Sequence, residues 1–236
     1  MKFILLFPFM LLLISCASDS PISPNLYFPS TVTSISGNIT NWNEGEIGKI
    51  VFWIQYNGLD TVSSAQIDPE GNFNLSELRD LSDSELLNPP YPQYSSSVTY
   101  IDNSMVCSDS TARSAIGLFF TYLGENDDVY DQILNKNFEY SLAWSKDKLS
   151  YGDYYIDYIF CDKDVRLIGD VETHYTFNAS KGEIQDHYNL QLKKGWNKRI
   201  TQILKHSYYT EGDTTITIAE YNIMNYEPGG SFWDSY

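Results

Sequence analysis

The chain is short of basic residues, with 15 Lys and Arg against 31 Asp and Glu among 236 residues and a formal net charge of −16. Nucleic acids and anionic lipid headgroups attract proteins that carry clustered Lys and Arg, and the sequence has no such cluster. We therefore expect no nucleic-acid partner. The carboxylates are scattered rather than spaced as a calcium-binding loop, so we interpret them as a solvated surface.

Short catalytic motifs are also missing. There is no glycine-rich phosphate loop ahead of a helix, no G-x-S-x-G and no H-E-x-x-H. The three histidines, His174, His187 and His206, are far apart in the sequence, and their spacing predicts no metal site. We therefore predict no catalytic residue, no metal and no cofactor.

No apolar run is long enough to span a membrane. The first run, Phe3 to Ile14, follows a single positive charge at Lys2 and contains Pro8. A transmembrane helix needs about 20 apolar residues, and polar residues 18–20 come soon after this run. Its length and its small Ser15 are typical of a cleaved signal peptide instead.

The end of this run, Leu13-Ile14-Ser15-Cys16, resembles the lipobox of bacterial lipoproteins. The resemblance implies that residues 1–15 are a signal peptide and that Cys16 is lipidated, with a diacylglycerol on its sulfur and an acyl chain such as palmitate on its amine. The alternative is an ordinary secretory signal with an incidental cysteine. Ala17 stands where inner-membrane lipoproteins carry aspartate, so the family rule favours the outer membrane. The protein could face either the periplasm or the cell exterior.

Only two cysteines, Cys107 and Cys161, remain after Cys16. In an oxidising compartment they can form one disulfide if their Cα atoms lie within about 7 Å, or they can stay buried as free thiols. Neither has a histidine close by in the sequence, so we do not expect a catalytic thiol.

Short strands account for most of the mature chain. Ile50, Phe52 and Ile54 alternate with Val51 and Trp53, so both faces of this strand are apolar and it should lie centrally in a sheet. Further strands are predicted at 114–123, 138–144, 154–161, 165–168, 171–177, 187–192, 199–204 and 215–221, and short helices at 76–87 and 127–136. The pattern predicts an all-β fold, an antiparallel β-sandwich built as one composite unit or as two small domains.

The turn Asp68-Pro69-Glu70-Gly71 has the residues that a tight hairpin turn requires. With the strands around it, the segment 32–75 resembles the transthyretin-like or carboxypeptidase-regulatory-like β modules of exported bacterial proteins. The resemblance implies an immunoglobulin-like or transthyretin-like sandwich with a structural or adhesive role.

Pro- and Ser-rich segments suggest the domain organisation. Residues 16–30 are predicted to be a flexible tether behind the lipidated cysteine, and 88–97 a linker or a long loop. They separate an N-terminal β module at 31–87 from a C-terminal β domain at 98–236.

Aromatic residues are in excess, with 19 Tyr, 12 Phe and 5 Trp. Tyr151, Tyr154, Tyr158 and Trp196 are candidates for an exposed row that binds a glycan or an envelope protein. The alternative is that these rings belong to the core of the sheet.

Three hypotheses follow for function. The first is a lipid-anchored, non-enzymatic envelope protein with a structural or interaction role. The second is a surface protein that binds carbohydrate or protein through exposed aromatic residues. The third is a hydrolase with an unrecognised pair of carboxylates.

Overall fold

The computed structural model describes residues 31–40, 42, 47–55, 59–86, 89–90, 98–123, 129–136, 150–225 and 232–235. Fourteen strands of these residues join into one sheet, with one single-turn 3-10 helix, η1 (Asp83–Glu85). The strands are β1 (Ile35–Thr40), β2 (Gly48–Gln55), β3 (Leu59–Ile67), β4 (Asn72–Leu75), β5 (Val98–Asn103), β6 (Val106–Cys107), β7 (Ser114–Leu123), β8 (Val129–Lys136), β9 (Tyr154–Cys161), β10 (Val165–Phe177), β11 (Ser180–Leu192), β12 (Gly195–Glu211), β13 (Thr214–Met224) and β14 (Phe232–Ser235). The predicted all-β class is confirmed, and no helix in the described ranges is long and apolar enough to cross a membrane.

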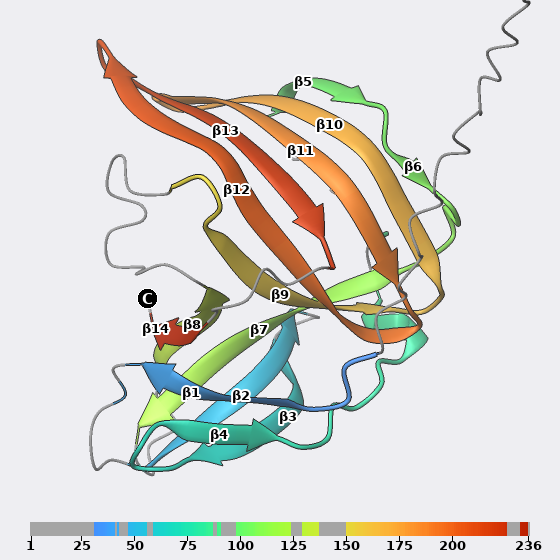
Figure 1. Ribbon diagram of the computed structural model, residues 1–236, viewed down its shortest axis with the longest axis vertical. Coiled ribbons are helices and arrows are strands. Elements are labelled where there is room, and N and C mark those ends of the chain that lie inside the picture. Colours follow the sequence, from blue (N-terminus) through green and yellow to red (C-terminus); the bar gives the residue numbers. More distant parts are fainter. Residues whose placement is uncertain are drawn as a thin grey trace, which may run out of the picture.

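The sheet has a lower and an upper part (Figure 1). Below, the order β1-β4-β3-β2-β7-β8-β14 closes on itself, because β14 pairs with β1 in parallel and with β8 antiparallel. Above, the long strands β10, β11, β12 and β13 lie side by side, with β5 on the outer edge. Strand β9 joins the two parts, since it pairs with β7 and β8 on one side and with β12 on the other.

The predicted domain boundary at 88–97 lies mostly outside the described residues. Hydrogen bonds of the sheet connect the strands on either side of it, because β2 pairs with β7 from Gly48 opposite Leu123 to Ile54 opposite Gly117. Strand β2 is central, as its two apolar faces predict, with β3 on its other edge. The division into two domains stays a prediction.

The hairpin turn at Asp68 forms as its residues predict. The Asp68 carboxylate accepts hydrogen bonds from the backbone amides of Glu70 (3.1 Å) and Asn72 (2.8 Å), and the amide of Gly71 donates to the Asp68 carbonyl (2.9 Å). Gly71 has a φ of 85°, which favours glycine. The turn joins β3 to β4 and thereby fixes their register.

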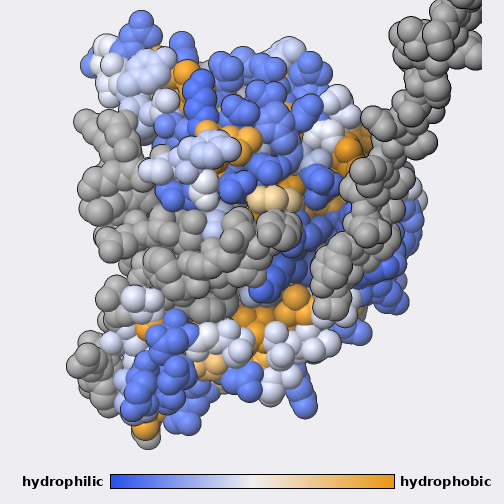
Figure 2. Space-filling view, viewed as in Figure 1, coloured by the Kyte–Doolittle hydropathy of each residue, from blue (hydrophilic) through white to orange (hydrophobic). Residues whose placement is uncertain are grey.

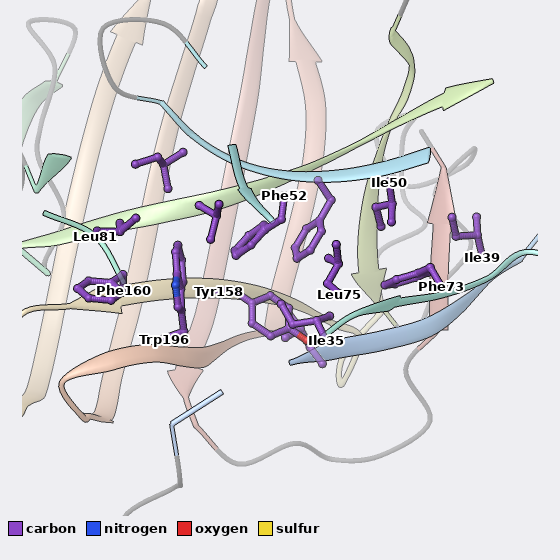
Figure 3. Packing of buried hydrophobic residues seen from close by; sticks show 14 of the residues in the cluster. Ile35, Ile39, Ile50, Phe52, Phe73, Leu75, Leu81, Tyr158, Phe160 and Trp196 are labelled. Carbon is purple, nitrogen blue, oxygen red and sulfur yellow. The ribbon is translucent and has the colours of Figure 1, made fainter. Parts of the chain in front are cut away.

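The main hydrophobic core lies between the lower strands and β9 and β12 (Figure 3). The ring of Phe52 stacks on Phe119 with centroids 4.5 Å apart, and it also contacts Trp196 at 4.8 Å and Tyr158 at 6.1 Å. The indole of Trp196 donates a hydrogen bond to the carbonyl of Arg79 (3.0 Å). This core ties residues of the first and second halves of the chain into one packed unit.

Both predicted helices are wrong. Residues 129–136 form β8, which pairs with β7, β9 and β14. Of the described residues 76–86, only η1 is helical. Leu81 and Leu86 enter the core from a segment without regular helix, and the Arg79 carbonyl of this segment accepts the hydrogen bond from Trp196.

Strands 165–168 and 171–177, predicted as separate, form the single strand β10, which pairs with β11 without interruption. Gly169, which lies between the two predicted strands, has a φ of 124°, a conformation that favours glycine. A Cβ atom at this position would lie 2.7 Å from the Ser104 carbonyl oxygen, so the close approach of the neighbouring segment requires glycine.

Candidate functional site

Three of the four aromatic residues predicted to bind a ligand lie in the core. Tyr154 is 0% exposed, and Tyr158 and Trp196 are each 2% exposed, whereas Tyr151 is 81% exposed. Tyr154 and Tyr158 do share one face of β9, as their spacing predicts, but that face packs against the lower strands. The predicted binding row is therefore wrong for Tyr154, Tyr158 and Trp196.

Cys107 and Cys161 are both free thiols and belong to one apolar cluster on β6, β9, β10 and β11. Burial raises the pKa of the Cys161 thiol to about 11 and raises that of Cys107 above its usual value. Both groups are therefore protonated near neutral pH and poorly nucleophilic, which agrees with the absence of a cysteine-hydrolase motif. Cys16 lies outside the described residues.

The structure contains a cavity of about 430 Å³ that the sequence did not reveal. It lies on the inner face of β9, β12, β13 and β11, against the start of β7 and Pro89 and Pro90. Its volume falls in the range of small-molecule sites, about 300–1,000 Å³. On the face shown in Figure 2, the broadest group of hydrophobic residues lies in the lower half of the molecule, whereas the upper half is mostly hydrophilic with smaller hydrophobic spots.

Strand alternation points a mixed row of side chains into the cavity. Ile184, Asp186 and Tyr188 are two residues apart on β11, so they share its inner face. In the parallel register with β13, Asp186 lies opposite Tyr221 and Tyr188 lies opposite Ile223. The cavity wall thus combines apolar side chains with tyrosine rings around one carboxylate.

A second polar group of the cavity comes from β12. Arg199 lies opposite Asp157 of β9 in the register, and its Nη2 and Nε atoms are 2.7 Å and 3.3 Å from the Asp157 carboxylate. Both side chains are mostly buried. Thr201, the next inward residue of β12, lies opposite Tyr155.

Asp186 differs from Asp157 in having no such partner. No described residue makes a hydrogen bond or an ion pair with the Asp186 carboxylate, and burial raises its pKa to about 6, although Arg199 and His187 act in the opposite direction. Burial also raises the pKa of Tyr155 to about 12 and that of Tyr221 above its usual value. The tyrosine hydroxyls are thus neutral near pH 7, and Asp186 is a partly buried acceptor with no donor among the described residues.

Sequence reasoning missed this site because the predicted strand began at His187, one residue after Asp186. The available signal was the inner row Ile184, Asp186, Tyr188 and Leu190, in which a single charge interrupts an apolar alternation. Such a charge is costly unless something binds it.

No protein-family model matches this chain, and neither a curated protein nor a solved structure is detectably similar to it. The chemistry of the site is therefore the basis for inferring its function.

Proposed function

We propose that this chain is a lipid-anchored, non-enzymatic binding protein of the bacterial cell envelope, and that its cavity binds a neutral, hydroxyl-rich ligand such as a short saccharide. The observation that carries the proposal is Asp186, a partly buried carboxylate to which no described residue donates a hydrogen bond, placed among tyrosines in a cavity of small-molecule size.

The charges around the cavity favour a neutral ligand. An anion would meet Asp186, and it would also have to approach a chain whose charge becomes −17 once Lys2 is removed with the signal peptide. A cation would meet Arg199. A hydroxyl group donates and accepts at once, so it complements the acceptor Asp186 and the donor Arg199 together.

The cavity wall suits the apolar face of a sugar ring. Tyr155, Tyr188 and Tyr221 contribute aromatic rings with a polar tip, and Ile159 and Ile223 contribute aliphatic surface. Pockets that bind small ligands are typically apolar with a few placed polar groups, and this cavity has that composition. We therefore still propose a carbohydrate ligand, but the aromatic residues that would bind it are the tyrosines of the cavity rather than exposed ones.

The contacts favour binding over hydrolysis. A glycosidase needs two carboxyl groups that flank the scissile bond. Beside Asp186, the nearby Asp157 is held by Arg199 at 2.7 Å, so it is poorly placed to act as a nucleophile or base.

For the fold, we propose a composite β-sandwich: β10–β13 and β5 form one layer, the strands of the closed lower ring that face them form the other, and β9 is the hydrogen-bonded connection. The cavity would then lie where the two layers meet, between β7 and the long upper strands. This arrangement is supported by the order of the strands and by the residues of the cavity wall.

A cavity-filling variant tests the binding proposal. Ile116 is 42% exposed at the cavity rim and lies opposite Ile159, so Ile116→Trp should fill the opening at little structural cost. On an array of neutral glycans, we expect the unlipidated mature chain to retain a defined set of saccharides and the variant to lose at least about tenfold of that signal.

The matched control is Ile101→Trp on β5, because Ile101 is 40% exposed and does not line the cavity. This variant should bind as the parent does. Binding that survives Ile116→Trp, or an array on which the parent chain retains no saccharide, would contradict the proposal.

The anchor has a separate test. Cys16→Ala removes the sulfur that the diacylglycerol would occupy, so we expect this variant to incorporate no fatty-acid analogue and to leave the membrane fraction of expressing cells. Cys107→Ala is the matched control and should be labelled as the parent is. Labelling that persists in Cys16→Ala would exclude the anchor while leaving the cavity proposal intact.

A further inference from the structure

A second group of polar side chains lies on the face of β10 and β11 opposite to the cavity. Glu172, His174 and Glu183 each direct one potential ligand atom toward the others, and all these atoms lie within 4.8 Å of one another. The Nε2 atom of His174 is 2.7 Å from a carboxylate oxygen of Glu172. The spacing of the histidines in the sequence predicted no metal site. The ligands that join His174 are instead two glutamates: Glu172 on the same face of β10, and Glu183 on the paired strand β11.

The backbone holds this group in place. Glu172 and His174 are two residues apart on β10 and so share a face, and His174 lies directly opposite Glu183 in a register of 13 consecutive pairs. The ring of Tyr100 packs edge-on against the imidazole with centroids 5.1 Å apart. The three ligand atoms therefore converge because of the sheet rather than through a loop.

His187, on the same face, also has two carboxylates close to its ring, but their oxygens do not meet at one nitrogen atom. His187 has Asp170 at Nδ1 (2.6 Å) and Glu220 at Nε2 (3.0 Å). These carboxylates contact different nitrogens of the ring, so they cannot share one ion with a single imidazole nitrogen. At His174, by contrast, one nitrogen and two carboxylates meet.

We propose that Glu172, His174 and Glu183 form a binding site for a divalent transition-metal ion of the Zn²⁺ type. One imidazole and two carboxylates are ligands that Zn²⁺ accepts, and their two negative charges balance the ion. Imidazole is a poor ligand for Ca²⁺ and Mg²⁺, which prefer oxygen. Asp102, opposite Glu172 on β5, adds a further negative charge nearby.

The surroundings leave room for a further ligand. A surface hollow of about 310 Å³ is lined by His174 and Glu183 together with Lys181 and Tyr209. Zinc sites with three protein ligands keep an open position for water or another molecule. We place this open position toward the hollow.

The test is calorimetric titration of the full, unlipidated mature chain with Zn²⁺ alone, repeated in excess Mg²⁺. We expect one equivalent to bind, without displacement by Mg²⁺, and the affinity to fall at least about tenfold in His174→Gln and in Glu183→Gln. The matched control, His187→Gln, should bind Zn²⁺ as the parent chain does.

Circular dichroism of each variant shows whether the β fold is kept, and the use of two variants protects the test against the misfolding of one. No binding by the parent chain would overturn the proposal. Equal affinity in folded His174→Gln, or an equal loss in His187→Gln, would also overturn it.

Discussion

Replacing Arg199 with methionine is expected to lower the free energy of unfolding by about 3–5 kcal/mol. The guanidinium lies 2.7 Å from the Asp157 carboxylate, and both side chains are mostly shielded from water. Methionine keeps much of the volume but leaves Asp157 charged and unpaired inside the sheet. Urea unfolding at pH 7.5, followed by circular dichroism, measures the loss.

The double variant Arg199→Met/Asp157→Leu separates the charge from the packing. Removal of both partners should recover most of the lost stability, because an apolar pair can replace a buried ion pair at little cost. Lys163→Met is the surface control and should cost about 1 kcal/mol or less, since its ion pair with Asp109 is exposed. If the double variant is as unstable as Arg199→Met, the unpaired Asp157 is not the cause.

The opposite effect is expected at the other carboxylate: Asp186→Asn should stabilise the chain by about 1–2 kcal/mol at pH 7.5. Burial raises the pKa of Asp186 from 3.8 to about 6, and a pKa difference of about two corresponds to at most ~3 kcal/mol. Partial contact of the side chain with solvent reduces this figure. Asparagine has nearly the same shape and carries no charge to bury.

The pH dependence identifies the cause. A carboxyl group whose pKa is higher in the folded state favours folding below its unfolded pKa, near 4, and this contribution is lost as the pH rises through about 6. The advantage of Asp186→Asn should therefore be near zero at pH 4, grow between pH 4 and 6, and stay constant above. An advantage that does not change with pH would exclude burial of the charge as its origin.

Local features of the fold were predictable from the sequence. The bounds of β7 and β9 agree with the predicted strands at 114–123 and 154–161, because alternation over eight or more residues is a local signal. The Asp68 turn was predictable for the same reason, since each of its residues favours its own backbone conformation.

Strand pairing was not predictable, because it depends on contacts between distant residues. Nothing local indicates that β14 pairs with β1, or that β11 and β13 run in parallel. The same limit hid the core positions of Tyr158 and Trp196. Alternation shows which residues share a face of a strand, but only the assembled sheet shows which face is covered.

In the candidate site, too, the local strand pattern was predictable and the strand pairing was not. The inward row of Ile184, Asp186 and Tyr188 is visible in the sequence once β11 is known to begin at Ser180. The positions of Arg199 and Tyr221 beside it depend on the pairing of β12 and β13. A buried charge in an apolar row is therefore a useful signal of a site, although it does not reveal the partners of the charge.

The most direct test of the central claim is to measure saccharide binding by Asp186→Asn beside its stability at pH 7.5. A saccharide retained by the parent chain on the glycan array supplies the ligand for calorimetric titration. If Asp186 is kept for a ligand at the expense of stability, the variant will be more stable and will bind the saccharide at least about tenfold more weakly. A variant that binds as tightly as the parent chain, whatever its stability, would contradict the account.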